Sequence, residues 1–172
     1  GLKLKENPSL IVTAYLESLM GENAKNSLGI EGQKERIYEI AKDLSARQDL
    51  NVHALESLGD AFLFSGHPEA AWQLMQVSIP RFQESSLLKL QSAKIASRTG
   101  LHLSEALVLI RETLQGPIEG GSGGREGAYV RQGQILQRLG KSAEAKRSFE
   151  QALRINPRHR GAKEGLEVVQ KK

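Results

Sequence analysis

The residues most suggestive of chemistry in this chain are a Gly-Lys-Ser triplet at 140–142. In a phosphate-binding loop the lysine of such a triplet reaches the phosphates and the hydroxyl binds Mg²⁺. That loop also needs an earlier glycine and a preceding strand, but Ile135 occupies the glycine position and a helical pattern precedes it. We therefore interpret Gly140-Lys141-Ser142 as a turn between two helices.

A glycine-rich stretch over 116–124 is the second candidate for a ligand loop. A dinucleotide-binding loop would join a strand to a helix in a βαβ unit, and no strand pattern flanks this stretch. Gly120-Gly121-Ser122-Gly123-Gly124 instead predicts a flexible linker. Such a run is typical both of an engineered replacement for a loop and of a natural glycine-rich loop.

Side chains that could act as metal ligands or nucleophiles do not cluster along the chain. There is no Cys, which excludes disulfides and thiolate metal sites. Metal-ligand spacing is absent from the four histidines, which are His53, His67, His102 and His159. Glu112 and Glu119 are isolated carboxylates, which we interpret as solvated. The sequence therefore predicts no catalytic site, no cofactor and no metal, and an enzyme is the least favoured class.

Charge and hydropathy narrow the range of partners. The formal net charge of +4 gives only weak support for an anionic partner. The basic C-terminal end lacks aromatic side chains and alternates with Glu164 and Glu167, so we expect a solvated surface rather than a nucleic-acid interface. No apolar run approaches the roughly 20 residues of a membrane-spanning helix.

Helical periodicity, broken by proline and glycine, dominates the chain. We expect Asn51 to cap one helix and Trp72 to pack in the core. On the second helix Glu35, Glu39, Lys42 and Asp43 should face water. The predicted helices cover about 8–21, 32–48, 51–66, 67–80, 86–100, 104–115, 126–139, 142–155 and 160–170.

The pattern repeats with a period of 34 residues, from Val52 to Ser86. A third unit starts late, near Glu126, after the glycine-rich stretch. These units resemble the tetratricopeptide repeat family, whose period is 34 residues. The third unit resembles it best, through Tyr129, Gly133, Leu136, Ala145, Phe149, Ala152 and Pro157. The first unit matches through Leu55, Leu58, Gly59, Phe62, Ala71 and Ser78, whereas the middle unit is degenerate, with Lys89 at an apolar position.

The resemblance implies an all-α fold, in which antiparallel helix hairpins stack into a right-handed superhelix. Residues 1–50 would form an N-terminal hairpin, 51–115 two hairpins, 125–157 the best-matching repeat and 158–172 a basic capping helix. Small residues such as Gly133 and Ala145 would let helices approach, while Phe149 fills the space between hairpins. One hairpin cannot bury its apolar face alone, so the units must stack.

The resemblance also implies a function, namely a non-catalytic scaffold that holds a protein or peptide segment in the concave groove. In this family the first helix of each hairpin lines the groove. The corresponding positions here are His53, Glu56, Asp60, Leu63, Phe64, Leu87, Leu90, Lys94, Arg98, Val130, Gln134 and Arg138. We expect acidic groups at one end, basic groups towards the other, and leucine and phenylalanine side chains as an apolar floor.

Two alternatives bear on the partner. Co-chaperones of this family grip a terminal carboxylate with Lys and Asn, but Glu56 and Asp60 occupy two of those positions, which disfavours that partner. Self-assembly is a second class of function, in which the groove of one copy holds the N-terminal hairpin or the basic cap of another and forms a homo-oligomer.

Overall fold

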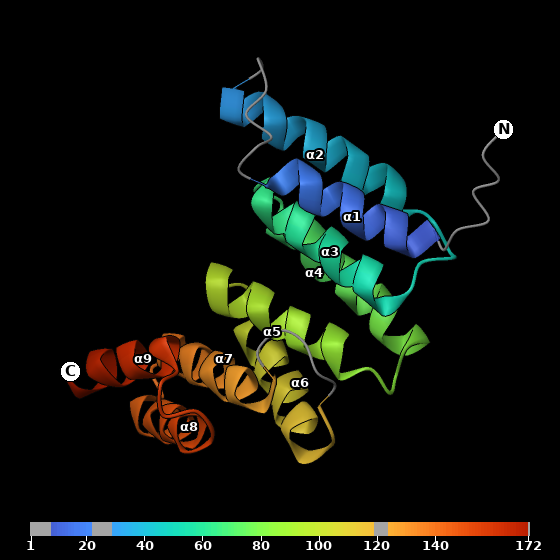
Figure 1. Cartoon of the computed structure of the whole chain (residues 1–172). Helices are drawn as coiled ribbons and strands as arrows, with labels where there is room; N and C mark the ends of the chain where they lie inside the picture. Colours follow the sequence, from blue (N-terminus) through green and yellow to red (C-terminus); the bar gives the residue numbers. More distant parts are fainter. Residues whose placement is uncertain (1–7, 22–28, 119–123, 172) are drawn as a thin grey trace, which may run out of the picture. The chain divides into compact units, whose positions relative to one another are not determined.

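A computed structural model describes residues 8–21, 29–118 and 124–171 of the chain. Every regular element in those ranges is a helix (Figure 1). The chain divides into two compact units, residues 1–83 and 84–172. The predicted all-α repeat fold is thereby confirmed, and each unit is described in turn.

The N-terminal unit contains two helix hairpins. The first consists of α1 (Pro8–Met20) and α2 (Gly29–Ser45), and the second of α3 (Val52–Phe64) and α4 (Pro68–Ser78). Helix α3 packs against α1, α2 and α4. Pro80 lies in a short 3₁₀ turn, Ile79–Arg81, that directly follows α4.

Local chemistry explains where α3 begins and ends. The Asn51 side chain accepts a hydrogen bond from the Ala54 backbone N–H at 3.0 Å, as a helix N-cap should. The Asn51 backbone N–H in turn donates to Ser9 Oγ at 2.9 Å, which ties α1 to the start of α3. After α3, Gly66 has a φ of +85°, a left-handed conformation that favours glycine. The predicted cap at Asn51 is confirmed.

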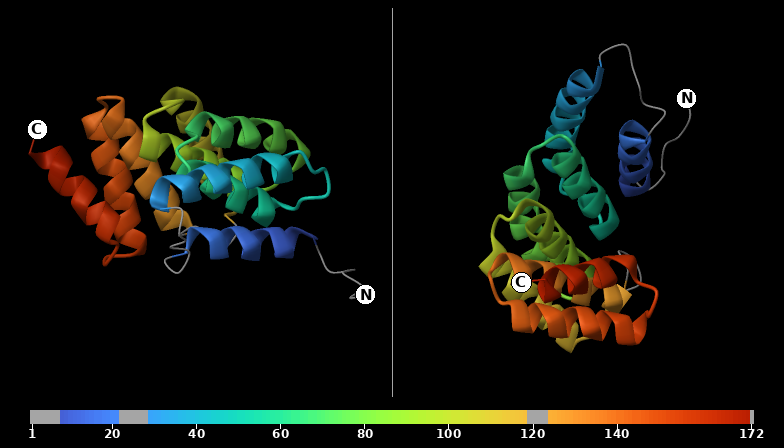
Figure 2. Two further views of the ribbon diagram at one scale, coloured as in Figure 1. Left: turned by 90° about the horizontal axis from the view of Figure 1, so that it is seen from above. Right: turned by 90° about the vertical axis from the view of Figure 1, so that its left-hand side faces the viewer.

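The C-terminal unit repeats one packing pattern along its length (Figure 2). Its helices are α5 (Ser86–Thr99), α6 (Leu103–Gln115), α7 (Gly124–Arg138), α8 (Ser142–Ile155) and α9 (Arg160–Gln170). Helices α5 and α6 form one hairpin and α7 and α8 the next. Helix α7 contacts both α5 and α6, and α9 contacts both α7 and α8 in the same way. We call α5, α7 and α9 the first-helix row.

Phe149 holds the last hairpin and α9 together. Its ring is fully buried. A Cβ atom built at Gly133 on α7 would lie 2.6 Å from Phe149 Cε1, and one at Gly165 on α9 would lie 2.4 Å from Phe149 Cζ. The two glycines therefore allow α7 and α9 to approach this ring closely, as predicted for Gly133.

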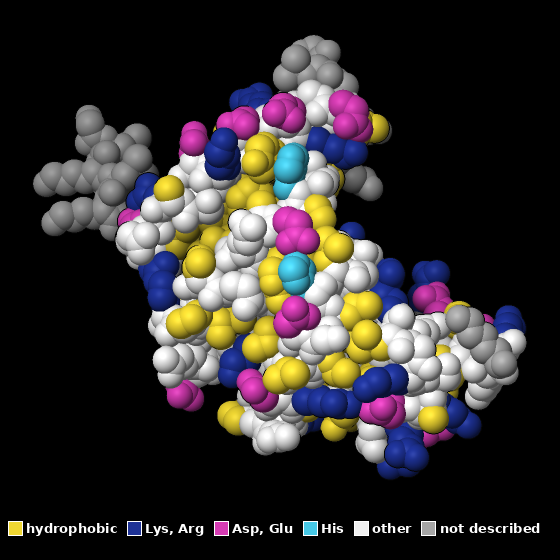
Figure 3. All heavy atoms as spheres, turned by 180° about the vertical axis from the view of Figure 1, so that it is seen from behind, with side chains coloured by type: hydrophobic (Ala, Val, Ile, Leu, Met, Phe, Trp, Pro, Cys, Tyr) yellow, Lys and Arg dark blue, Asp and Glu magenta, His cyan; other side chains and the backbone are white. Residues whose placement is uncertain are grey.

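The predicted solvent-facing and buried positions agree with the structure. Glu35, Glu39, Lys42 and Asp43 are all exposed on α2, and acidic and basic side chains alternate along this helix at the top of Figure 3. Trp72 is buried, with 6% of its surface exposed. The Gly-Lys-Ser triplet is the predicted interhelical turn between α7 and α8.

The helix boundaries agree with the predicted ranges to within a few residues. The last helix spans Arg160–Gln170 as expected, whereas α7 begins at Gly124, inside the predicted linker over 116–124. Residues 119–123 of that linker, and Lys172 of the predicted basic cap, lie outside the described residues.

Candidate functional site

A pocket of about 340 Å³ lies along the first-helix row of the C-terminal unit. All three helices of the row contribute to its wall. The lining residues are Lys94, Ser97 and Arg98 from α5, Gly127, Val130, Arg131 and Gln134 from α7, and His159 and Gly161 at the start of α9. We call this the row pocket. Its volume lies at the lower end of the range for ligand sites, roughly 300–1,000 Å³.

The row pocket has a basic lining. Lys94, Arg98 and Arg131 contribute cationic side chains, and none of its lining residues is an Asp or a Glu. Lys94 and Arg131 are half-buried and Arg98 is exposed. Because low-dielectric walls focus the field of the charges around a hollow, this arrangement attracts anionic groups.

Hydrogen bonds from one arginine side chain to backbone carbonyls hold α7 against α5, the two helices that carry the cationic side chains of the row pocket. Arg138, at the end of α7, donates from Nε to the Ser97 carbonyl at 2.9 Å and from Nη2 to the Arg98 carbonyl at 3.3 Å. These carbonyls belong to the last turn of α5, where a cation also complements the helix dipole. Arg138 therefore ties α7 to the C-terminal end of α5, directly beside Arg98.

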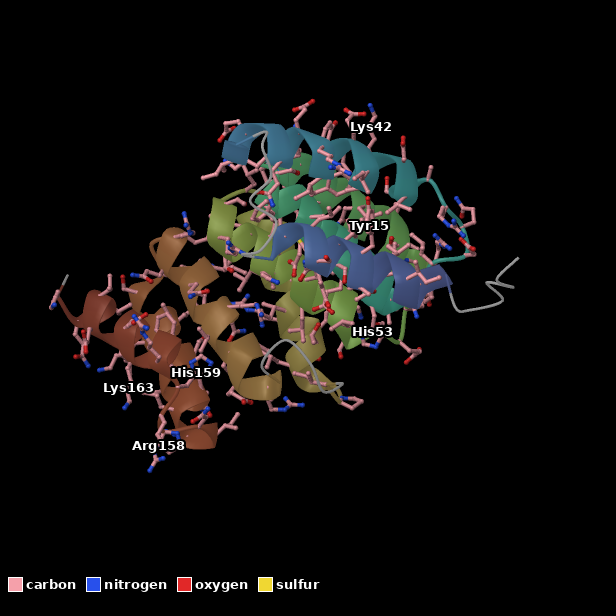
Figure 4. All side chains as sticks on the ribbon, turned by 45° about the horizontal axis from the view of Figure 1, so that its top comes forward. Tyr15, Lys42, His53, Arg158, His159 and Lys163 are labelled. Carbon is pink, nitrogen blue, oxygen red and sulfur yellow. The ribbon has the colours of Figure 1, made fainter. Side chains whose placement is uncertain are left out.

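The start of α9 closes the other side of the row pocket. His159 is the residue before α9, and its Nδ1 is buried without a hydrogen-bond partner among the described residues. Arg160, next to it, donates to Glu164 at 2.6 Å, and this hydrogen bond raises the pKa of the Arg160 guanidinium. Figure 4 labels His159 together with Arg158 and Lys163, which are both exposed.

The structure brings some of the predicted groove residues together. Lys94, Arg98, Val130 and Gln134 all line the row pocket. Leu87 and Leu90, predicted as an apolar floor, are 2% and 1% exposed, so they pack in the interior instead of forming an open surface. Arg138 is exposed but directs its guanidinium to backbone carbonyls.

The remaining predicted groove residues belong to the N-terminal unit. They lie on α3, where His53 and Phe64 are exposed and Glu56, Asp60 and Leu63 are half-buried. Because the two units are separate bodies in this structure, a groove that joins these residues to the row pocket stays a prediction.

The sequence interpretation missed Gly127, Arg131, His159 and Gly161 in this site. A signal for one of them was present, because Gly161 follows Gly127 by 34 residues, the repeat period. Gly161 thus has the same position in the repeat pattern on α9 as Gly127 has on α7. It was interpreted only as a solvating cap because its charged residues dominate its composition.

A second pocket, of about 380 Å³, lies in the N-terminal unit between α1 and α2. Its wall is mainly apolar, with Ile11 and Tyr15 44% and 43% exposed. Asp43 and Arg47 supply its charged groups, one of each sign. This α1–α2 pocket therefore offers an apolar contact surface without a dominant charge.

Neither pocket contains a combination of side chains that is typical of catalysis. Within the described ranges, no group of three or more His, Cys, Asp or Glu residues could hold a metal ion. The same ranges contain no helix that is both long and apolar enough to cross a membrane.

Comparisons with known proteins agree with this geometry. Residues 126–159 match the family model of the tetratricopeptide repeat. A crystal structure of MamA protein matches with a TM-score of 0.58 and 15% sequence identity, over 93% of this chain and 81% of that chain. At this identity the likeness shows the fold alone. A comparison with curated proteins found no match.

The repeat predicted to begin at Glu126 is thereby confirmed, and with it the resemblance to the tetratricopeptide family. A protein-interaction scaffold is the general function that this repeat supports, with a protein as its partner.

Proposed function

We propose that this chain is a non-catalytic scaffold that binds a segment of a partner protein along its first-helix row. The row pocket is the observation that carries this proposal. It combines residues of three successive helices, and four of the predicted groove residues line it. Repeat solenoids bind their partners along such rows because each repeat adds a similar surface beside the last.

The lining favours a peptide segment over a small-molecule substrate. Ligand sites for small molecules enclose most of the ligand surface, whereas the row pocket is open along the helices that line it. Here the exposed Arg98 and the half-buried Lys94, Arg131 and Gln134 offer polar contacts over two helices. Val130 and the aliphatic stems of the longer side chains make most of the exposed wall apolar. An extended segment could therefore bind across the helices and form polar contacts along its length.

Affinity capture with the whole chain, compared between variants, tests this proposal. Lys94→Glu with Arg98→Glu reverses two charges of the row pocket, and Lys163→Glu with Lys171→Glu reverses two exposed charges outside it. We expect the first pair to lose the captured partner and the second pair to retain it. Circular dichroism must show that both variants keep their helical content. If the Lys163/Lys171 pair abolishes capture and the Lys94/Arg98 pair does not, the basic C-terminal end is the contact surface.

Self-assembly is the second candidate function, and the α1–α2 pocket favours it. Ile11 and Tyr15 expose nearly half of their surface on a mainly apolar wall, and such patches commonly mark interaction sites. Sedimentation equilibrium over a range of concentrations distinguishes the two functions. A mass that rises with concentration, and returns to that of the monomer in Ile11→Ser, would support self-assembly through this hairpin. A constant monomer mass would exclude it.

A further inference from the structure

We infer that the row pocket recognises an acidic segment of its partner, through Asp or Glu side chains that lie within the partner's chain. This inference rests on the proposed function, since it names the partner of the same site. The observation behind it is the sign of the charge on the side chains that line the pocket. Three cationic side chains and one histidine surround the pocket, and no carboxylate is among the lining residues.

The basic groups of the row pocket come from different elements of the first-helix row. Lys94 and Arg98 come from α5, Arg131 from α7 and His159 from the residue before α9. A single terminal carboxylate would be bound by groups that converge on it. Lysine and arginine side chains on two successive helices instead match several carboxylates along one segment, each with a charge-assisted hydrogen bond.

Burial of the lining side chains makes the pocket selective for charge. Lys94 and Arg131 are half-buried, so their charges are screened less than those of fully solvated side chains. A Lys or Arg side chain of a partner would meet like charges here, which costs binding free energy.

The absence of a side chain at Gly161 leaves room in the pocket for the partner backbone. Gly127 and Gly161 line the pocket on α7 and α9, beside the buried Val130. A Cβ atom built at Gly161 would lie 3.5 Å from Val130 Cγ1 and 3.5 Å from His159 Cε1, which is ordinary contact. The methyl group of an alanine would therefore fit there and occupy space that a ligand could otherwise use.

A nucleic acid fits this lining less well than an acidic peptide. Proteins that bind single strands combine a basic groove with aromatic side chains on which the bases stack. The lining contains no Phe, Tyr or Trp. The basic residues alone would attract phosphates, so an oligonucleotide is a necessary competitor in any test.

A peptide-display library selected on the whole chain separates this inference from the proposed function. We expect the selected peptides to be enriched in Asp and Glu. If no peptide is selected, the proposed function fails. If peptides are selected without acidic enrichment, the proposed function stands and the inference about the partner is overturned.

A synthetic copy of one selected peptide, acetylated and amidated at its ends, then locates the site by fluorescence anisotropy. Replacing its Asp and Glu residues by Asn and Gln should weaken binding to the unmodified chain at least about tenfold. Lys94→Gln with Arg131→Gln should weaken binding of the acidic peptide by a similar factor. The matched control is Arg147→Gln with Lys163→Gln, which removes the same charge types from exposed positions on α8 and α9 outside the pocket, and it should bind within about twofold of the parent.

Three results would overturn the inference. The first is equal binding of the acidic and the neutralised peptide, which requires no protein variant and so holds even if the Lys94/Arg131 variant does not fold. The second is binding only to peptides with a free C-terminal carboxylate. The third is displacement of the peptide by a single-stranded oligonucleotide at lower concentration than by the unlabelled peptide, which would indicate a nucleic-acid site.

Discussion

Substitution of Gly133 by alanine tests the packing that positions α7 and α9 in the first-helix row. In a helix interior, glycine to alanine normally stabilises by about 1 kcal/mol. At Gly133, however, the new Cβ atom would lie 2.6 Å from Phe149 Cε1 and 2.8 Å from Cδ1. Overpacking of this kind costs about 1–3 kcal/mol. The ring has no room to move because Phe149 is fully buried.

The balance of these two effects gives a net loss. We expect Gly133→Ala to lower the free energy of unfolding by about 0–2 kcal/mol, the overpacking cost less the gain in helix propensity. Gly165→Ala meets the same ring at 2.4 Å, but α9 packs mainly on α7 and α8, whereas α7 packs on α5, α6, α8 and α9. Helix α9 can therefore shift outward more easily, and the loss there should be about 0–1 kcal/mol.

Gly161→Ala is the matched control, because it makes the same change on α9 where the nearest atoms lie 3.5 Å away. It should raise stability by up to about 1 kcal/mol. Urea unfolding followed by circular dichroism measures all three variants. A Phe149→Leu change in the Gly133→Ala background should recover part of the loss, which would show as a coupling energy in a double-mutant cycle. If Gly133→Ala gains as much stability as Gly161→Ala, Phe149 does not lie between these helices as described.

Three further substitutions test other parts of the account. Phe149→Ala should lower the free energy of unfolding by about 3–5 kcal/mol, because it removes a fully buried aromatic ring. A melting temperature within a degree or two of that of the parent would contradict this. Asn51→Ala removes the cap of α3 and should cost about 0.5–2 kcal/mol in urea unfolding, while Asn51→Asp, which can still accept from Ala54 N–H, should cost less. Arg138→Gln removes the two hydrogen bonds between α7 and the last turn of α5, and it should lower the free energy of unfolding by about 1 kcal/mol. Amide hydrogen exchange at Gly100 should become faster. Unchanged exchange would show that the two hydrogen bonds contribute little.

The sequence was most informative where local chemistry determines structure. Proline, glycine and Asn51 mark helix ends because their backbone preferences and capping groups act within a few residues. Periodicity likewise identified Trp72 as a packing residue, since apolar side chains at helical spacing must be buried together, and the family resemblance implied the packing role of Phe149. These features require no knowledge of which helices are neighbours.

The site itself depends on contacts between helices, and there the sequence was less informative. Leu87 and Leu90 belong to the predicted apolar floor, but they are buried, and which helices cover a side chain depends on contacts that no local pattern specifies. The contribution of His159 was missed because the residues of its helix were interpreted by charge and not by repeat phase. The hydrogen bonds of Arg138 to the last turn of α5 join residues about forty positions apart, which no local pattern indicates.

Binding along the first-helix row is the central claim, and chemical-shift mapping tests it most directly. The measurement is a titration of the isotope-labelled chain with the displayed peptide or captured partner segment, followed through backbone amide signals. The account predicts that the largest shifts fall on lining residues of the row pocket, such as Ser97, Val130, Gln134 and Gly161, while Lys146 on the outer helix α8 changes little. Shifts concentrated on α8, on the α1–α2 pocket or at the basic C-terminal end, with the row pocket unchanged, would contradict it.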